Sequence, residues 1–151
     1  MTVAGYTLTP EQIELRKFAR DVAERHLVAR ADEVEKAGAF FPRDLIDLFR
    51  DLDLLGIDVP QEHGGQGLDV LTCALVMEEI ARGWFSASSY PVAMGTGPIL
   101  AAGTTEQKAR YLPRIARGEV ITAFALTEPD AGSDASGLRT VARRDGDAYV
   151  I

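Results

Sequence analysis

Hydrophobic side chains recur at helical spacing over most of the chain, and this pattern stops near residue 120. In the first stretch, residues 10–30, charged residues separate the apolar positions Leu15, Phe18, Ala19 and Val22. The preceding Thr9-Pro10-Glu11-Gln12 has the order of a capping box with proline at the first helical position. We therefore expect a helix that begins at Pro10, loosens after Arg30 and ends by Gly38.

The same spacing predicts further helices over residues 41–56, 69–83, 98–102 and 104–117. Phe41–Pro42 is the expected start of the second helix and Gly56 its stop, and Asp69 is the expected cap of the third. Thr104–Gln107 repeats the capping box at the start of the last helix, which Pro113 is expected to bend.

A different pattern begins at Ile121–Thr127, a short apolar run rich in β-branched and aromatic residues that predicts a buried strand. The polar turn Glu128–Asp134 follows directly. Such a turn can direct backbone N–H groups and hydroxyls toward an anionic ligand such as a phosphate, or it can be only a hairpin corner. Looser alternation over Leu138–Arg143 and Ala148–Ile151, joined by Asp145-Gly146, predicts a hairpin.

These patterns predict a mainly α-helical chain in two parts. Residues 1–120 form a helical domain, and residues 121–151 form the first strands of a β domain. Two or three strands cannot bury a β core by themselves. We therefore expect the last part to be the front edge of a second, incomplete domain.

Composition narrows the class of protein. The 151 residues are 46% hydrophobic and 26% charged, which is typical of soluble globular proteins. The net charge of −7 is spread along the chain and leaves no basic face, so a nucleic-acid partner is not expected. No apolar run reaches the length needed to cross a bilayer and no signal segment opens the chain, so we expect a cytoplasmic protein without membrane insertion.

Isolated reactive residues do not form a recognisable site. Cys73, the single cysteine, excludes an internal disulfide and a cysteine-based zinc site, and no metal site is expected. His26 is expected to be a packing residue, and His63 a loop or packing residue. The glycines in residues 61–67 lack the strand and lysine of a phosphate-binding loop, so we expect a tight reversal. The small residues of 84–94 fit close packing or pocket lining equally well.

Several stretches, in order, resemble one family, the flavin-dependent acyl-CoA dehydrogenases. They are Leu55-Gly-Ile-Asp-Val-Pro60, Glu62-His-Gly-Gly-Gln-Gly67, Met77-Glu-Glu-Ile-Ala-Arg82, Gly97-Pro-Ile-Leu100, Gly103-Thr-Thr-Glu-Gln-Lys108, Arg110-Tyr-Leu-Pro-Arg-Ile-Ala-Arg-Gly-Glu119 and Ala125-Leu-Thr-Glu-Pro-Asp-Ala-Gly-Ser-Asp134. The last is similar to the family's signature and is the most specific. The resemblance covers nearly the whole chain.

The resemblance implies a subunit with an N-terminal helical domain, a middle β-barrel domain and a C-terminal four-helix domain, assembled as a dimer or tetramer. It implies FAD as cofactor, an acyl-CoA thioester as substrate and an acceptor of the electron-transfer-flavoprotein type. In such enzymes a carboxylate removes the α proton while the β hydride passes to the flavin. The family's catalytic glutamate and a second flavin-packing stretch lie further downstream, so no catalytic residue is expected within residues 1–151.

The resemblance also implies roles for individual residues. Phe124, Leu126 and Thr127 match positions that flank the flavin ring, although many members have tyrosine at the position of Phe124. Ser133 matches a serine near the FAD pyrophosphate and the pantetheine of CoA, and Gly132 would permit close backbone approach. Glu128 and Asp134 are expected to be structural.

Residues 87–97 match the floor of the family's acyl pocket. Tyr90 and Met94 are accordingly expected to contact the substrate and limit its length. Two other classes stay open at this point. One is a helical interaction module without flavin, and the other is a relative with monooxygenase or nitroalkane-oxidase chemistry.

Overall fold

The computed structural model describes residues 2–3, 6–38 and 42–151. Its α-helices are α1 (Pro10–Val22), α2 (Val28–Ala37), α3 (Arg43–Asp51), α4 (Val70–Gly83), α5 (Thr96–Ala102) and α6 (Thr105–Ala116). Shorter helical turns are η1 (Ala23–Leu27), η2 (Gln61–His63), η3 (Phe85–Ser89) and η4 (Ala135–Gly137). Two antiparallel pairs join β1 (Thr2–Val3) to β2 (Tyr6–Thr7) and β3 (Arg143–Asp145) to β4 (Ala148–Val150). The mainly α-helical class predicted from the sequence is confirmed.

The start of α1 is the predicted capping box. The Gln12 N–H donates to Thr9 Oγ1 at 3.2 Å, and the Thr9 N–H donates to Gln12 Oε1 at 3.1 Å. The helical rod continues through η1, a π-helical turn, into α2. It ends at Gly38, whose φ of +59° suits glycine and confirms the expected stop.

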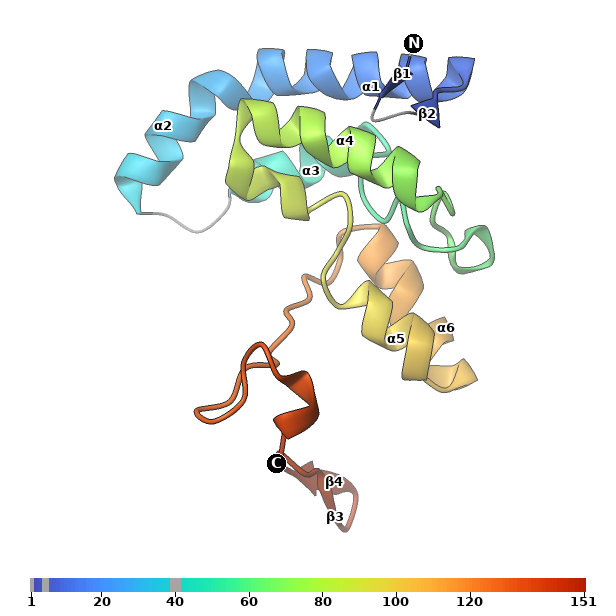
Figure 1. Cartoon of the computed structure of the whole chain (residues 1–151), viewed down its shortest axis with the longest axis vertical. Coiled ribbons are helices and arrows are strands. Elements are labelled where there is room, and N and C mark those ends of the chain that lie inside the picture. Colours follow the sequence, from blue (N-terminus) through green and yellow to red (C-terminus); the bar gives the residue numbers. More distant parts are fainter. Residues whose placement is uncertain (1, 4–5, 39–41) are drawn as a thin grey trace.

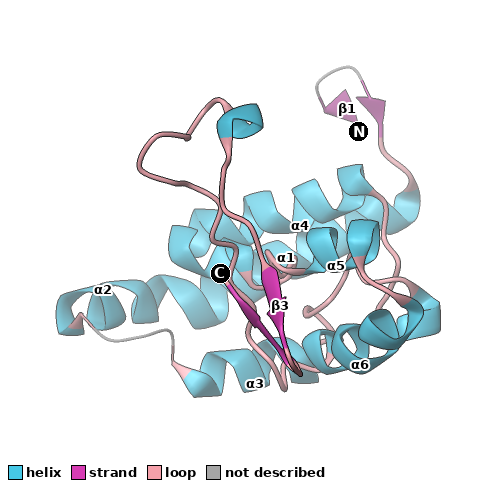
Figure 2. Cartoon of the chain, turned by 90° about the horizontal axis from the view of Figure 1, so that it is seen from below, coloured by secondary structure: helices cyan, strands magenta, loops and turns pink. Residues whose placement is uncertain are grey.

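The main core lies between α1, α3 and α4. Figure 1 shows α1 and α4 side by side, and Figure 2 shows α3 along the opposite side of the core from α4. Fully buried side chains from these elements and the loops between them fill the space: Leu27, Phe49, Leu54, Ile57, Val76 and Ile80. Asp69 caps α4 as predicted, because its carboxylate accepts the Thr72 N–H at 3.0 Å.

A buried carboxylate joins α1 to α4. The Glu79 side chain is 2% exposed, and it accepts hydrogen bonds from Arg16 Nε at 2.7 Å and from Arg20 Nε at 2.8 Å. The hydrogen bonds from Arg20 are the main cause that lowers the pKa of Glu79, and burial opposes them. An ionised Glu79 therefore fixes the register of the two helices.

The helices α5 and α6 form a smaller unit with its own apolar cluster, made of Val59, Leu112, Ile115 and Ala116. The second capping box is confirmed, since the Gln107 N–H donates to Thr104 Oγ1 at 3.2 Å and the Thr104 N–H to Gln107 Oε1 at 2.8 Å. Pro113 lies inside α6, and the bend expected there stays a prediction. Gly118 follows α6 with a φ of +65°, in the left-handed region that suits glycine.

Two helix boundaries differ from the prediction. The helix α3 ends at Asp51, and the chain leaves it through Asp53 in the left-handed region (φ +54°), before Gly56 is reached. The predicted start at Phe41 lies outside the described residues. The helix α5 begins at Thr96, so Pro98 lies in its first turn, where a missing N–H costs no hydrogen bond.

The predicted strand Ile121–Thr127 is wrong for this structure. Residues 120–127, here called the connecting segment, run from α6 toward the C-terminal part without strand pairing to any described residue (Figure 1). A strand needs a neighbour to bond its N–H and C=O groups, and none of the described strands lies beside this segment. The expected strand over Leu138–Arg143 is also wrong except at its last residue, because β3 begins only at Arg143, whereas the hairpin turn at Gly146 is confirmed.

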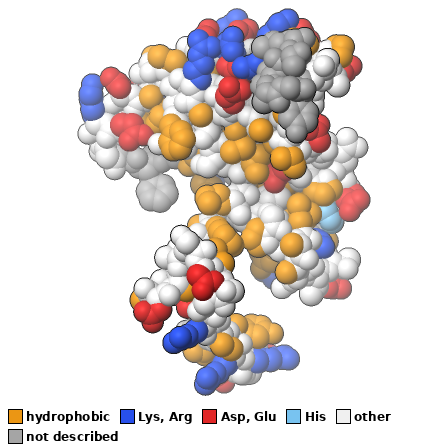
Figure 3. Space-filling model, in the orientation of Figure 1, with side chains coloured by type: hydrophobic (Ala, Val, Ile, Leu, Met, Phe, Trp, Pro, Cys, Tyr) orange, Lys and Arg blue, Asp and Glu red, His pale blue; other side chains and the backbone are white. Residues whose placement is uncertain are grey.

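The C-terminal part projects from the helical body, with the β3–β4 hairpin at its tip (Figure 1, Figure 3). Exposed apolar side chains mark this part: Ile121, Phe124, Leu126, Val141, Tyr149, Val150 and Ile151. None of the described helices is long and apolar enough to span a membrane. The described residues also hold no cluster of histidine, cysteine or carboxylate side chains suited to a metal ion.

Candidate functional site

A mostly apolar pocket of about 130 Å³ opens where the helical body meets the connecting segment. Its walls come from α3, α6, the turn after η3 and the connecting segment, through side chains that include Ile46, Leu55, Tyr90, Met94, Ile115 and Ile121. No carboxylate is among its described lining residues. The pocket can therefore hold an apolar group, but its own residues offer no carboxylate base.

Tyr90 and Met94, the two residues predicted to contact substrate, both line this pocket. Tyr90 stacks on the core residue Phe49, with ring centroids 6.5 Å apart and an angle of 14° between the rings, and burial raises the pKa of its hydroxyl. Met94 is more exposed, at 59%. The structure thus places both side chains at one cavity, and their contact with substrate stays a prediction.

The connecting segment is attached to the helical body beside this pocket. The Gly95 N–H donates to Thr122 Oγ1 at 3.0 Å. A Cβ added to Gly95 would lie only 2.6 Å from the Cβ of Thr122, so glycine is needed for this approach. The sequence indicated that residues 84–94 are rich in small side chains and that residues 87–97 resemble a pocket floor, but it did not predict the partner of Gly95.

The expected flavin-facing residues lie on the exposed part of the connecting segment. Phe124 is 48% exposed and Leu126 is 41% exposed. Thr127 is also exposed. None of the backbone groups of residues 121–127 hydrogen-bonds to the backbone of another described residue. The segment therefore presents apolar side chains, a hydroxyl and unpaired peptide groups on one short run of chain.

Glu128 and Asp134 organise the turn that follows. The Glu128 carboxylate accepts the N–H groups of Arg139 at 2.9 Å and Thr140 at 2.8 Å, and the hydrogen bond from the Thr140 side chain is the main cause that lowers its pKa. Asp134 caps η4 by accepting the Ser136 N–H at 3.1 Å. These contacts support the structural roles expected of both residues.

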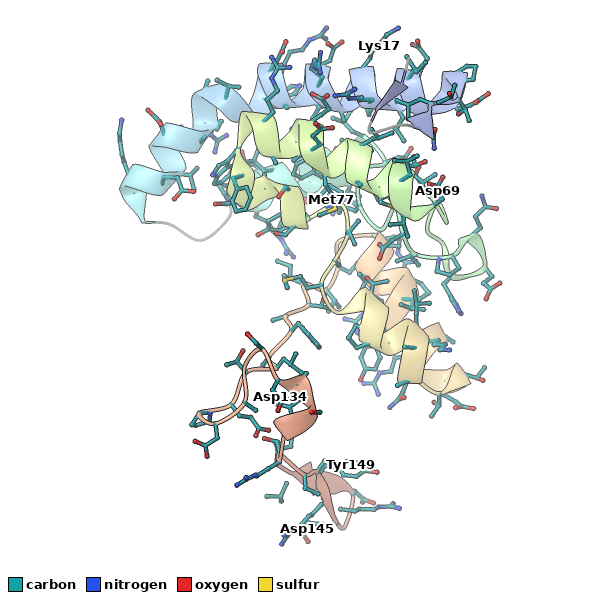
Figure 4. All side chains as sticks on the ribbon, viewed as in Figure 1. Lys17, Asp69, Met77, Asp134, Asp145 and Tyr149 are labelled. Atoms are coloured by element: carbon teal, nitrogen blue, oxygen red, sulfur yellow. The ribbon has the colours of Figure 1, made fainter. Side chains whose placement is uncertain are left out.

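Gly132 and Ser133 lie in this turn, away from the pocket. Both are exposed, and a Cβ added to Gly132 would meet no atom within 4 Å. Figure 4 shows the neighbouring Asp134 in the loop below the helical body, far from the helix that carries Met77. The structure therefore does not bring Ser133 together with Tyr90 and Met94.

The glycine-rich loop does not form a phosphate cradle. The Gly65 N–H donates to the Pro60 carbonyl at 3.3 Å, and the Gly67 N–H donates to the Val59 carbonyl at 2.8 Å. A Cβ at Gly65 would lie 2.2 Å from the Val59 carbonyl oxygen. The loop uses its N–H groups and its space for its own closure, as expected of a tight reversal.

Cys73 is buried in α4, whereas His26, expected to be a packing residue, is exposed. Burial raises the pKa of the Cys73 thiol to about 11, which disfavours the nucleophilic thiolate. His26 lies at a groove between η1 and α3, where Arg30 bonds Asp44 at 2.8 Å. Neither residue lines the pocket of Tyr90 and Met94.

Comparison with known proteins decides the family. Residues 9–119 match the family model of the acyl-CoA dehydrogenase N-terminal domain. The chain belongs to the acyl-CoA dehydrogenase family. Its members among known proteins are oxidoreductases, and the resemblance noted in the sequence is confirmed.

Individual relatives agree with this assignment. The chain is 45% identical to a 3-(aryl)acrylate reductase of Clostridium sporogenes over 93% of its own length and 38% of the relative's. It is 43% identical to a subunit of the caffeyl-CoA reductase–Etf complex of Acetobacterium woodii, over 91% of the chain and 37% of that protein. A crystal structure of an acyl-CoA dehydrogenase complexed with FAD from Bacillus anthracis matches with a TM-score of 0.81 and 36% identity, over 95% and 26% of the two chains.

The chain matches only part of the length of each relative. It spans well under half the length of these relatives. Activity, substrate and partners of a whole acyl-CoA dehydrogenase therefore enter only as proposals.

Proposed function

We propose that this chain is the N-terminal part of an FAD-dependent acyl-CoA dehydrogenase that removes the α and β hydrogens of an acyl-CoA thioester. Residues 1–120 would be its helical domain, and residues 121–151 the start of its middle β domain. One observation carries the proposal: the exposed Phe124–Thr127 run leads directly away from the pocket lined by Tyr90 and Met94. An acyl group in the pocket would then lie close to a flat ring on the segment.

The residues of the connecting segment fit a flavin ring. Phe124 and Leu126 are two positions apart, so in an extended chain they share a face and can pack on an apolar ring. The Thr127 hydroxyl and the unpaired peptide groups can bond the polar edge of the ring. When bound, FAD supplies the hydride acceptor. The chain's own contribution is to orient the ring and exclude water from one side of it.

The turn after the segment is proposed to bind the anionic end of the ligands. Gly132 leaves open space for close approach, and the Ser133 hydroxyl is exposed beside it. Glu128 holds the loop closed through Arg139 and Thr140, which supports a preformed shape. Ser133 would then contact the FAD pyrophosphate and the pantetheine of CoA.

The pocket limits the acyl group. Its volume of about 130 Å³ is comparable to the roughly 150 Å³ apolar cavity that holds a benzene molecule. A short acyl chain or a single ring would fit a pocket of this volume. Tyr90, stacked on Phe49, would end the pocket, and Met94 would border its mouth.

We propose that residues 1–151 alone are inactive, because the proton-removing carboxylate is contributed by a later part of the protein. The electron acceptor is proposed to be of the electron-transfer-flavoprotein type, which the name of the Acetobacterium relative supports. A cytoplasmic dimer or tetramer is the proposed assembly.

The reductive direction is a second candidate. The relatives that are 45% and 43% identical are both named reductases. In that direction an α,β-unsaturated acyl group in the same pocket would receive a hydride at its β carbon, supplied by reduced FAD, and a proton at its α carbon, supplied by the carboxyl group of the later part of the protein. The residues of this chain would hold the substrate in the same way for either direction.

The test compares the 151-residue chain with the complete enzyme encoded by the same reading frame. We expect the complete enzyme to purify with about one FAD per subunit and to oxidise a short or aryl acyl-CoA, whereas the 151-residue chain lacks both properties. Absence of FAD from the complete enzyme would contradict the proposal in favour of a flavin-free interaction module. Tight FAD binding by the 151-residue chain would contradict the proposed half-site.

A further inference from the structure

Thr122 occupies an unusual position at the base of the connecting segment. It lines the pocket that contains Tyr90 and Met94, and it also lines a second apolar groove beside Pro98 and Tyr111. Thr122 therefore forms part of the wall between this pocket and the second groove.

The contact between Thr122 and Gly95 is both polar and steric. The Gly95 N–H donates to Thr122 Oγ1 at 3.0 Å. A Cβ at Gly95 would lie 2.6 Å from Thr122 Cβ and 2.8 Å from Oγ1, so the backbone of one residue rests on the side chain of the other. Of the hydrogen bonds made by described residues, this one alone joins residues 121–127 to the helical body.

The contact between Gly95 and Thr122 lies between the proposed acyl-binding residue Met94 and the proposed flavin-packing residue Phe124. Met94 precedes Gly95 directly, and Phe124 follows Thr122 by two positions. An extended chain advances about 3.3 Å per residue, so a shift of one residue at Thr122 would move Phe124 by that distance relative to Met94. The rate of a reaction between two bound groups is sensitive to misplacement of about 1 Å.

We propose that Thr122 is a positioning residue that fixes the pocket wall at Met94 relative to the ring-facing run Phe124–Thr127. The inference rests on the proposed function, because it assigns a purpose to the spacing between acyl pocket and flavin surface. In this role Thr122 needs no contact with a reacting atom. It acts through the segment that it attaches to Gly95.

The first experiment uses the complete enzyme and compares Thr122→Val, Thr122→Ser and the control Thr105→Val. Valine keeps the shape of threonine and removes the hydrogen-bond acceptor, serine retains the acceptor, and Thr105 is exposed at the start of α6. For Thr122→Val we expect a roughly tenfold lower rate of flavin reduction, a shifted visible flavin spectrum, and unchanged FAD content and melting temperature. Thr122→Ser should restore most of the rate, and Thr105→Val should behave as the unmodified enzyme.

The inference is overturned if Thr122→Val reduces its flavin at the normal rate, or if Thr122→Ser is as slow as Thr122→Val. It is also overturned if the loss of rate is matched by loss of FAD or of folded protein, because Thr122 would then be only structural.

A second experiment uses the 151-residue chain and separates this inference from the proposed function. We expect chymotrypsin to cleave after Phe124 several times faster in Thr122→Val and in Gly95→Ala than in Thr105→Val. Equal cleavage rates would overturn the attachment itself. If the complete enzyme proves not to be a flavin dehydrogenase, the proposed function fails and the positioning role fails with it, whereas faster cleavage would still demonstrate the contact.

Discussion

Glu79 shows how one buried side chain sets the position of two helices. Its carboxylate is 2% exposed and bonds Arg16 and Arg20 of α1, while its neighbour Glu78 is 59% exposed and contacts Arg16 only at 3.5 Å. Removal of one partner from a buried ion pair leaves the others uncompensated. A comparison of the two glutamates therefore measures how much burial of the carboxylate adds to the free energy of unfolding.

Glu79→Ala is expected to lower the free energy of unfolding by about 3 kcal/mol, near the low end for buried pairs because Arg20 still reaches solvent. Glu78→Ala is expected to cost less than about 1 kcal/mol. Urea unfolding followed by circular dichroism measures both. Equal losses for the two variants would contradict the assigned role of Glu79.

The same carboxylate predicts a dependence of stability on pH. The pKa of Glu79 in the folded protein lies below its ordinary value of 4.5, chiefly because of the hydrogen bonds from Arg20. A group with a depressed folded pKa stabilises the fold above its unfolded pKa and loses that contribution as pH falls through the folded pKa. The melting temperature should therefore fall below about pH 4.5 more steeply for the unmodified chain than for Glu79→Gln. Parallel curves would count against this assignment.

Tyr90 stands between two cavities, and this position predicts a change in acyl preference. It lines both the pocket of about 130 Å³ and a neighbouring pocket of about 260 Å³ under Trp84. In the complete enzyme, Tyr90→Ala should open a path between them and raise kcat/KM for longer acyl chains by about fourfold per added methylene. Phe85→Ala, at an exposed aromatic residue of η3, is the matched control. An unchanged chain-length profile in Tyr90→Ala would refute the role.

At the scale of elements, the π-helical turn η1 lies where α4 approaches the α1–η1 rod closely. A Cβ at Gly83 would lie 2.8 Å from Ala23 Cβ and 2.9 Å from the Ala23 carbonyl oxygen. Gly83 ends α4, and Ala23 begins η1. Small residues on both sides allow the backbones to approach, and the extra residue of the π-turn lies at this approach.

Gly83→Ala is therefore expected to lower the free energy of unfolding by about 1–3 kcal/mol through overpacking. Gly97→Ala should be neutral or slightly stabilising, because Gly97 lies in α5 with no atom within 4 Å of an added Cβ. Thermal unfolding of the two variants tests the difference. A stable Gly83→Ala protein would show that the crossing can widen without cost.

Local signals predicted the elements that local chemistry specifies. Thr9, Asp69 and Thr104 cap their helices because the partners lie within three residues of the cap.

The strand prediction for Ile121–Thr127 is wrong because a strand depends on a neighbouring strand, which the sequence of the run itself does not reveal. The contacts of Gly95 with Thr122 and of Glu79 with Arg16 join residues far apart in sequence, so spacing could not predict them. For the site, the sequence indicated Tyr90 and Met94 but not the wall residues Ile46 and Leu55.

At the scale of the whole molecule, the helical body and the C-terminal part differ in how much apolar surface they bury. The body encloses a continuous core from α1 to α4, and the C-terminal part projects from it with exposed apolar side chains (Figure 1, Figure 3). This contrast supports a domain boundary near residue 120, which stays a proposal. Stability should accordingly reside almost wholly in the body.

Limited proteolysis of the 151-residue chain is expected to cut first within residues 121–130 and leave a resistant fragment of about residues 1–120. The melting temperature of a chain ending at residue 120 should lie within a few degrees of that of the 151-residue chain. Mass spectrometry identifies the cut, and calorimetry compares the two. Initial cleavage within α1 or α4, or a large drop in melting temperature on truncation, would contradict the boundary.

The pairing of α1 with α4 also has a consequence for synthesis. Arg16 leaves the ribosome long before its partner, since the two are 63 residues apart. At about 5–20 residues per second, the apolar face of α1 waits about 3–13 seconds for α4 to arrive. During that interval the apolar face of α1 is exposed to solvent. The apolar face of α1 therefore stays uncovered until α4 has been synthesised.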